Sequence, residues 1–184
     1  MRYFSIFLFV ISLTIPQIIG AFPIPDDKEV SFDVIRKNKI IGNLTTRFIE
    51  EEEKLVLHSI LDINVKILFI PAYKFFQETK ETWLEGKFIS IDGFTDFEDD
   101  REYKIIGKDT EEFFIASGMD GELKLDKDIF PLNYWNISML DRDEVFDTQK
   151  GIVRKINVKK LKSEKIKINN KSVIAEKYLF NASK

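Results

Sequence analysis

The chain has 184 residues, with 28 basic and 31 acidic side chains, a net charge of −3 and no cysteine. The absence of cysteine excludes disulfides, thiolate metal sites and a cysteine nucleophile, so an exported form must depend on its apolar core for stability. The acidic balance disfavours nucleic acid as a partner.

A cleaved secretory signal is the first predicted element and covers residues 1–21. One basic residue, Arg2, precedes an uncharged apolar run at residues 3–15, and small residues lead to a processing point after Ala21. A membrane anchor is the alternative, but it needs roughly 20 consecutive apolar residues. We therefore expect an exported protein, periplasmic in a Gram-negative envelope, whose residues 22–184 form a single domain without a membrane span.

A β-hairpin is predicted at the start of the mature chain. Apolar and polar residues alternate over residues 30–34, residues 37–39 form a polar turn, and residues 40–49 return as the second strand. Gly42 interrupts the second strand, which indicates a bulge or a close approach of the backbone.

The longest predicted strand covers residues 54–70, KLVLHSILDINVKILFI, and ends before Pro71. From Ser59 onward apolar and polar residues alternate, and this period of two indicates a half-buried strand. At about 3.3 Å per residue such a strand crosses a whole small domain, so its neighbours should pair along it and share its apolar face. That face carries Leu61, Ile63, Val65, Ile67 and Phe69.

An amphipathic helix is predicted over residues 73–85, packed against the sheet and ended by Gly86. One helical face carries Phe75 or Phe76, Thr79 and Trp83. The glutamates Glu78, Glu81 and Glu85 lie mostly on another face. The competing interpretation is a strand that continues through Tyr73 and Phe75.

Shorter strands separated by turns are predicted at residues 87–91, 101–107, 112–116, 122–125, 145–147, 151–160, 164–169 and 172–180. Residues 136–140 fit a short helical turn. The acidic segment 92–100 is interpreted as a surface hairpin loop, because it lacks the alternating ligands and closing glutamate of an EF-hand calcium loop. Together these elements predict a mainly β fold, an antiparallel curved sheet or open β-barrel with one helix packed against or over its concave side.

A catalytic site is not expected. His58 is the only histidine and should be a surface or half-buried structural residue, and no serine or threonine has a glycine-framed nucleophile setting. The pairs Glu78 with Glu81 and Asp141 with Asp143 could do acid and base work, but such pairs commonly serve solubility. The sequence has no phosphate-binding glycine loop and no dinucleotide fingerprint. We expect a protein that is not an enzyme and uses no cofactor or metal.

Basic residues concentrate at the C-terminal end. Residues 151–184 contain 10 basic and 2 acidic side chains, a local charge of +8. One interpretation is a basic face for anionic lipid head groups or an acidic partner. The other, which the pattern favours, is that lysines alternate with residues such as Ile156 and Ile166 to keep late strands soluble and sheet edges unpaired.

A resemblance to a known family is carried by the segments FDVIRKNKIIG, ETWLEGKFISI, FPLNYWN and DTQKGIVRKINV. Their markers are Phe32, Gly42, Glu81, Trp83, Gly86, Pro131, Trp135, Asn136 and Gly151. Over residues 30–180 the chain resembles uncharacterised bacterial exported proteins with a domain of unknown function, which are similar in fold to the open β-barrels of periplasmic lipoprotein carriers. The resemblance implies no established activity and no catalytic residues. Similar proteins continue past residue 180 into a final hairpin with a Trp-Tyr-Asp signature. Either the present chain is shortened or this hairpin is absent, and its absence would leave the strand at 172–180 as an exposed edge.

The aromatic segment 128–135, DIFPLNYW, is typical of a cavity mouth or, more frequently, of the end-cap of a barrel core. We expect an envelope protein that binds a lipid or acyl chain in a half-barrel cavity lined by Ile63, Val65, Ile67, Phe69, Trp83, Tyr134 and Trp135. The alternative is a structural or protein-interaction module of the envelope, in which the same residues fill a solid core. A third hypothesis is a secreted glycoprotein, since acceptor triplets begin at Asn43, Asn136, Asn170 and Asn181.

Overall fold

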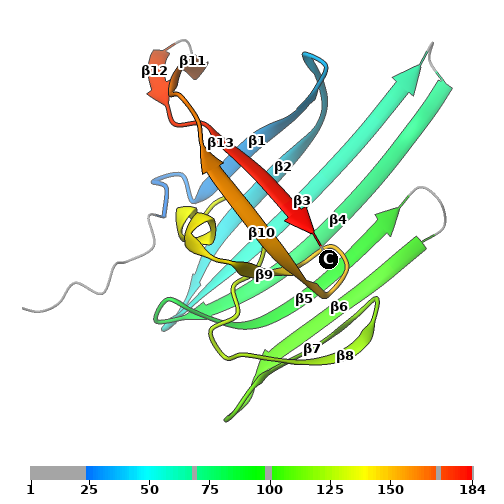
Figure 1. Ribbon diagram of the computed structural model, residues 1–184, viewed down its shortest axis with the longest axis vertical. Coiled ribbons are helices and arrows are strands. Elements are labelled where there is room, and N and C mark those ends of the chain that lie inside the picture. Colours follow the sequence, from blue (N-terminus) through cyan, green and yellow to red (C-terminus); the bar gives the residue numbers. More distant parts are fainter. Residues whose placement is uncertain (1–23, 68–69, 98–100, 169–170, 184) are drawn as a thin grey trace, which may run out of the picture.

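The chain folds as a curved antiparallel sheet that is partly covered by a second, smaller sheet (Figure 1). The computed structural model describes residues 24–67, 70–97, 101–168 and 171–183. The first sheet has eight strands in sequence order. They are β1 (Glu29–Arg36), β2 (Lys39–Glu51), β3 (Lys54–Ile67), β4 (Ile70–Leu84), β5 (Lys87–Phe97), β6 (Arg101–Asp109), β7 (Phe114–Gly118) and β8 (Gly121–Leu125).

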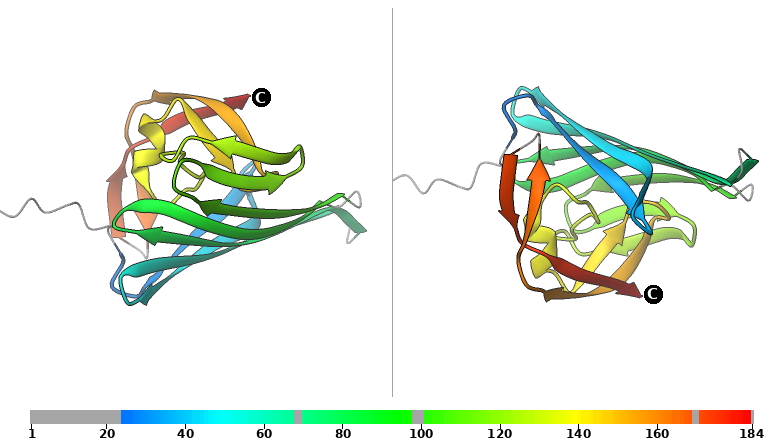
Figure 2. Two further views of the ribbon diagram at one scale, coloured as in Figure 1. Left: turned by 90° about the horizontal axis from the view of Figure 1, so that it is seen from below. Right: turned by 90° about the horizontal axis from the view of Figure 1, so that it is seen from above.

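The second sheet has three strands in the order β13–β10–β9, which are β9 (Glu144–Asp147), β10 (Ile152–Lys160) and β13 (Tyr178–Ser183). β11 (Glu164–Ile168) and β12 (Lys171–Ala175) form a separate two-stranded hairpin. A 3-10 helix, η1 (Ile137–Asp141), precedes β9. Figure 2 shows that the second sheet lies over one part of the concave face, while the far ends of β3, β4, β5 and β6 extend beyond it.

The predicted N-terminal hairpin is confirmed as β1 and β2. Lys37 and Asn38 have φ values of 50° and 60°, the left-handed geometry of a tight hairpin turn whose twist matches its strands. The β1–β2 pairing shifts register beside Gly42, and a Cβ added at Gly42 would lie 2.2 Å from the Asp62 carbonyl oxygen on β3. The bulge and the close approach expected at Gly42 are both present.

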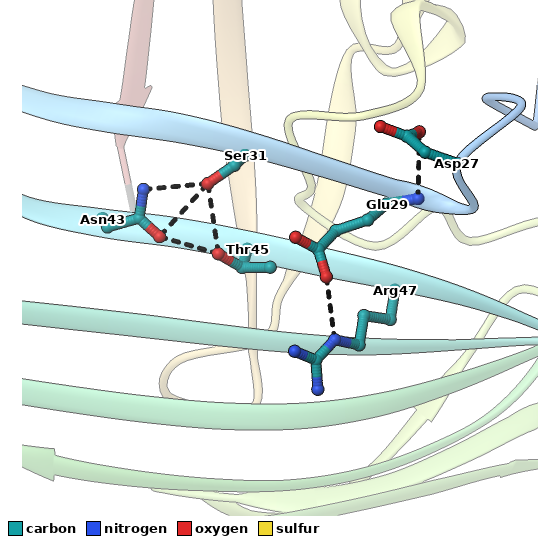
Figure 3. A network of polar contacts seen from close by, with 6 residues as sticks. All are labelled: Asp27, Glu29, Ser31, Asn43, Thr45 and Arg47. Atoms are coloured by element: carbon teal, nitrogen blue, oxygen red, sulfur yellow. Dashed lines mark hydrogen bonds and ion pairs between the residues drawn. The ribbon is translucent and has the colours of Figure 1, made fainter.

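Polar side chains form a network on the outer face of this hairpin (Figure 3). Asn43 Nδ2 donates to Ser31 Oγ at 2.9 Å, and Thr45 Oγ1 donates to Asn43 Oδ1 at 2.7 Å. Arg47 and Glu29 form an ion pair at 2.9 Å. Cross-strand contacts of this kind each contribute a few tenths of a kcal/mol, up to roughly 1 kcal/mol, and they keep the edge strand β1 in register.

The long central strand is confirmed, with a different end. β3 pairs with β2 on one side and with β4 on the other, and Leu57 and Leu61 on its inner face are buried. The strand ends at Ile67, whereas the sequence predicted an end just before Pro71. Pro71 is instead the second residue of β4, beside a register shift where a missing N–H is tolerated.

The helix predicted at residues 73–85 is wrong, and the competing strand is what forms. β4 pairs with β3 and with β5 along most of its length, so every second side chain points inward. The buried inward residues are Phe75, Gln77, Thr79, Glu81 and Trp83. In the described part of the chain the only helical element is η1, which confirms the short helical turn predicted for residues 136–140.

The first sheet stays open, because β1 and β8 remain its two edges and do not pair with each other. This confirms the open antiparallel form that the sequence predicted. Among the described residues, no helix has the length and apolar character needed to span a membrane.

The core lies between the concave face and the elements that cover it. Trp83 of β4 is at its centre, with the ring centroids of Phe88, Phe130 and Trp135 at 5.4, 5.3 and 5.5 Å. Such edge-to-face and tilted contacts are favourable for aromatic quadrupoles. Phe146 of β9 is fully buried in the same cluster, so the covering sheet closes this part of the core.

The two sheets meet where Gly118, at the end of β7, approaches Gly151. The Met119 N–H donates to the Lys150 carbonyl at 2.7 Å. A Cβ added at Gly118 would lie 2.5 Å from both the Gly151 Cα and the Lys150 oxygen. This contact requires glycine because the colliding atoms belong to the backbone and cannot rotate away.

Gly118→Ala is therefore expected to lower the free energy of unfolding by about 1 to 3 kcal/mol, the usual effect of overpacking a close contact. Urea unfolding measures this loss. Ser117→Ala, a change at the exposed neighbouring residue, should leave the unfolding midpoint nearly unchanged. Equal midpoints for the two variants would contradict a tight junction at Gly118.

Candidate functional site

The candidate site lies in the middle of the inner face of β4. Three consecutive inward side chains, Gln77, Thr79 and Glu81, are polar and buried. Pairing with β3 and β5 fixes their direction. Buried polar groups need hydrogen-bond partners. The partners of Glu81 are Trp83, Asn133 and Trp135, and the partner of Gln77 is Thr148.

A small polar cavity of about 40 Å³ lies between this row and the residues that cover it. On one wall the hydroxyls of Thr46 and Ser59 hydrogen-bond at 2.8 Å. On another, Gln77 Nε2 donates to Thr148 Oγ1 at 3.3 Å. A space of this size holds about three water molecules, so it takes a small polar group and not an acyl chain. Its lining also includes Leu44, Leu61, Thr79, Glu81, Leu132, Asn133, Tyr134, Trp135 and Gln149.

Glu81 is the ionisable group of this cavity, with 2% of its surface exposed. Trp83 Nε1 donates to Glu81 Oε2 at 3.1 Å. Desolvation raises the pKa of Glu81 to about 7, and the N–H groups of Trp83, Asn133 and Trp135 limit this rise because they stabilise the ionised form. The carboxyl group therefore changes its charge near neutral pH in a place that solvent barely reaches.

The loop before η1 brings Asn133 to the carboxyl group. Asn133 Oδ1 accepts from the Asn136 backbone N–H at 3.4 Å, and Asn136 Oδ1 caps η1 through the Ser138 N–H at 3.0 Å. These contacts orient the buried Asn133 amide so that Nδ2 faces the Glu81 side of the cavity. Asn133 is thereby one of the donors that stabilise the ionised form of Glu81.

Three predicted site residues come together around Glu81. Tyr134 and Trp135 line the polar cavity, and Trp83 lies beside it as the donor to the carboxylate. Tyr134 is 56% exposed and stands at the mouth of the cavity, whereas Trp83 and Trp135 belong to the aromatic core. Trp83 is a buried core residue, and Trp135 packs against the core while it also lines the cavity.

The aliphatic members of the predicted site lie elsewhere on the same concave face. Ile63 and Val65 are further along β3 and are half-buried. Ile63 pairs with the buried Phe75 on β4. The Ile67 side chain and the whole of Phe69 lie outside the described residues. The described members therefore fall into two groups, one at the core and one towards the far ends of β3 and β4.

Sequence reasoning missed the polar residues of the site. The predicted helix placed Glu81 on a solvated face, and Asn133 was noticed only as part of an aromatic segment. A strand pattern was present as the signal, since every second residue from Phe75 to Trp83 is either aromatic or able to hydrogen-bond. Its three polar positions hid the pattern, because an inward strand face is expected to be apolar.

The carboxylate pairs suggested by the sequence do not form acid and base pairs. Glu78 and Glu81 are three residues apart on a strand and therefore face opposite sides of the sheet. On the outer face, His58 Nε2 lies 2.6 Å from Glu78 Oε1, and His58 is half-buried, as predicted. Asp141 and Asp143 are both exposed.

Acidic residues do not gather into a metal site in the described part of the chain, where no group of three or more potential ligands occurs. The first part of the segment 92–100, including Asp92 and Asp96, belongs to β5 and not to a loop. Residues 98–100 lie outside the described residues.

A larger pocket of about 310 Å³ lies near the β4–β5 turn, and Trp83 is part of its lining. Trp83, Phe88 and Phe130 form its apolar wall. Its charged lining consists of Lys87, Asp109, Lys127, Asp128 and Arg142. The volume suits a small ligand, but the five charged side chains make the pocket unsuited to an acyl chain.

One comparison with known proteins identifies a family. The family described as Domain of unknown function (DUF6134) matches residues 32–184. The match includes most of β1 and every later strand, so it contains Glu81 and the whole polar cavity. Comparisons with curated proteins and with solved structures give no match. The chain therefore belongs to the DUF6134 family, which is defined by a domain of unknown function.

Proposed function

We propose that this is an exported envelope protein, without catalytic activity, that binds the acyl chain of a lipid at the open end of its concave face. The observation that supports this most is the partial cover: the far ends of β3 to β6 extend beyond the second sheet (Figure 2). Apolar side chains left on an uncovered inner face usually mark a binding surface. The bacterial origin, the periplasmic location and the likeness in fold to lipoprotein carriers are part of this proposal.

The open end is defined by five inward side chains on three neighbouring strands. Ile63 pairs with Phe75, which pairs with Phe97, and Val65 pairs with Tyr73. Ile63 and Val65 are half-buried, and Tyr73 is 37% exposed. Phe75 is covered by Phe97, with ring centroids 5.0 Å apart. An acyl chain that lies across these five side chains would bury apolar surface on the ligand and on the protein, which stabilises binding.

Two cations border the open end and suggest the head group of the ligand. The Arg101 guanidinium lies 5.1 Å from the centroid of the Phe97 ring, and Lys150 Nζ lies 5.5 Å from it. Arginine and lysine at the rim of an apolar surface suit a carboxylate or phosphate. The proposed ligand class is therefore an anionic amphiphile such as a fatty acid.

A structural or protein-interaction module without a ligand is the second candidate. It is favoured by the aromatic packing around Trp83, which fills the covered part of the concave face. The polar cavity of about 40 Å³ is also too small for a chain. In this case the open end would be covered by another protein of the envelope.

The ligand content of the purified protein distinguishes the two candidates. Organic extraction followed by mass spectrometry should release a lipid or fatty acid, and the stripped protein should bind a fluorescent fatty acid. Ligand-free protein that gives no response to the probe would favour the module. The intact mass tests export separately, because signal cleavage would leave a chain starting at Phe22, and attached glycans would add to that mass.

Ile63→Asn should weaken the binding of a fluorescent fatty acid about tenfold. The substitution replaces apolar contact worth roughly 1.4 kcal/mol with a polar amide. Ile60→Asn is the matched control, because Ile60 is an identical residue on the outer face of the same strand. Fluorescence titration gives both affinities, with unfolding midpoints compared first. If both variants bind like the wild type, the ligand does not lie on Ile63.

A further inference from the structure

The basic C-terminal region forms a surface on β10, β13 and the β11–β12 hairpin, which lies beyond the end of β10 (Figure 1). On β10, Lys155 and Lys159 are exposed while Ile156 between them packs toward the core. Six exposed lysines of this surface are in no ion pair among the described residues: Lys155, Lys159, Lys162, Lys165, Lys167 and Lys171. We call these six residues, with the exposed apolar residues described below, the basic surface.

The acidic residues of this region do not neutralise the six lysines. Glu176 is paired with Lys160, and Glu164 with Lys177 at 3.1 Å. These two are the only acidic residues after Gly151. Within the part of the chain that the structure describes, none of the six lysines forms an ion pair. Their positive charge is therefore directed to solvent or to a partner.

Exposed apolar side chains accompany these lysines. Ile174 is 81% exposed, Ile168 is 52% exposed and Leu179 on β13 is 47% exposed. Lysines at sheet edges account for solubility, but solubility does not account for large aliphatic residues placed among them. Ile168 and Ile174 belong to the separate two-stranded β11–β12 sheet, and neither residue is part of the hydrophobic core.

Apolar and basic side chains occur together on both faces of the β11–β12 hairpin. Ile168 pairs with Lys171 on one face, and Lys165 pairs with Ile174 on the other. Both faces thus combine apolar and basic side chains. A rigid protein partner would contact one face, whereas a fluid layer of lipid head groups can surround both. This arrangement favours a membrane over an acidic protein.

We propose that the basic surface docks on anionic lipid head groups of a membrane, with the isoleucines of the hairpin entering the interface. Lysines near an anionic bilayer each increase binding roughly fivefold, and interfacial apolar residues add affinity that salt does not screen. The inference concerns the outer side of β10 and the hairpin, and it does not depend on any ligand at the open end.

The test is co-sedimentation of the full mature chain with vesicles of phosphatidylglycerol and phosphatidylcholine, compared with phosphatidylcholine alone. The wild type should bind the anionic vesicles and lose much of this binding when salt is raised. The double variant Lys165→Glu/Lys167→Glu should bind at least tenfold more weakly. The control is Lys104→Glu/Lys124→Glu, the same charge change at exposed lysines of β6 and β8, and it should retain most of the binding.

A second variant distinguishes insertion of the hairpin isoleucines into the membrane interface from electrostatic attraction of the lysines to the head groups. Ile174→Ser should weaken binding severalfold and leave the salt dependence unchanged, since it removes an apolar side chain and no charge. The proposal is overturned if the wild type does not bind anionic vesicles at low salt, or if both double variants lose affinity equally. Binding to an acidic polypeptide without binding to vesicles would assign the surface to an acidic protein instead.

Discussion

Trp83→Ala is expected to lower the free energy of unfolding by about 3 to 5 kcal/mol, the range measured for the loss of a large buried aromatic residue. Trp83 is 1% exposed, and its ring contacts those of Phe88, Phe130 and Trp135. The substitution leaves a large cavity at the point where β4 meets the covering loop. It also removes the N–H that donates to Glu81 at 3.1 Å. Urea unfolding followed by circular dichroism measures the loss.

Trp83→Phe divides this effect into packing and hydrogen bonding. The phenyl ring keeps much of the packing, but the buried carboxyl group loses a donor, which costs about 1 to 3 kcal/mol. This loss should be larger when Glu81 is ionised, because a charged acceptor gains more from the N–H. Tyr134→Ala, at a residue that is 56% exposed, is the surface control. If Trp83→Ala destabilised the protein no more than Tyr134→Ala, the core assigned to Trp83 would be incorrect.

Glu81→Gln is expected to remove a pH-dependent loss of stability of about 3 kcal/mol. Folding raises the pKa of Glu81 from its ordinary value of 4.5 to about 7, and each pKa unit corresponds to about 1.4 kcal/mol. The folded state therefore favours the neutral acid. The stabilisation is complete below pH 4.5 and is lost progressively as the pH rises to about 7.

The measurement is the difference in unfolding free energy between Glu81→Gln and the wild type at a series of pH values from 4 to 8.5. This difference should shift by about 3 kcal/mol in favour of the variant as the pH rises, whatever constant offset the amide introduces. Glu102→Gln, at an exposed residue of β6, is the surface control. Parallel pH profiles for Glu81→Gln and the wild type would show that Glu81 does not titrate near neutral pH.

At neutral pH the buried carboxyl group of Glu81 thus lowers the stability of the protein. The packing of the core does not require a carboxyl group at this position. Perturbed carboxyl groups of this kind often mark functional sites. Here Leu61 lines the polar cavity and precedes Ile63 on the same face of β3, so the cavity and the open end follow one another along one face. The charge of Glu81 would interact electrostatically with any head group that enters the cavity beside Asn133.

Local sequence patterns predicted much of the fold. The alternation in β3 and the polar turn at Lys37 and Asn38 act over a few residues, and both predictions hold. The pattern of β4 failed as a predictor because its inward side is half polar. Residues at a spacing of four, such as Thr79 and Trp83, satisfy a helix and a strand equally well. Long-range pairing with β3 and β5 decides between them.

The site was harder to predict than the fold. Its parts are separated by about 50 residues, and nothing in either segment shows that Asn133 will face Glu81. The contact depends on the loop before η1, which Asn136 and the packing of Trp135 on Trp83 hold in place. Contacts between distant segments leave no periodic trace in a single sequence, so composition and spacing could indicate neither this contact nor the raised pKa.

By itself, the sequence determined that the chain is built of antiparallel strands with tight polar turns, an aromatic core and a basic C-terminal region, because these follow from alternation, turn residues and charge counted along the chain. Only the tertiary structure decided that β4 is a strand and that Glu81 is buried beside Trp83 and Asn133. The reason is physical. β4 is a strand because it pairs with β3 and β5, and Glu81 is buried because a distant segment covers the concave face.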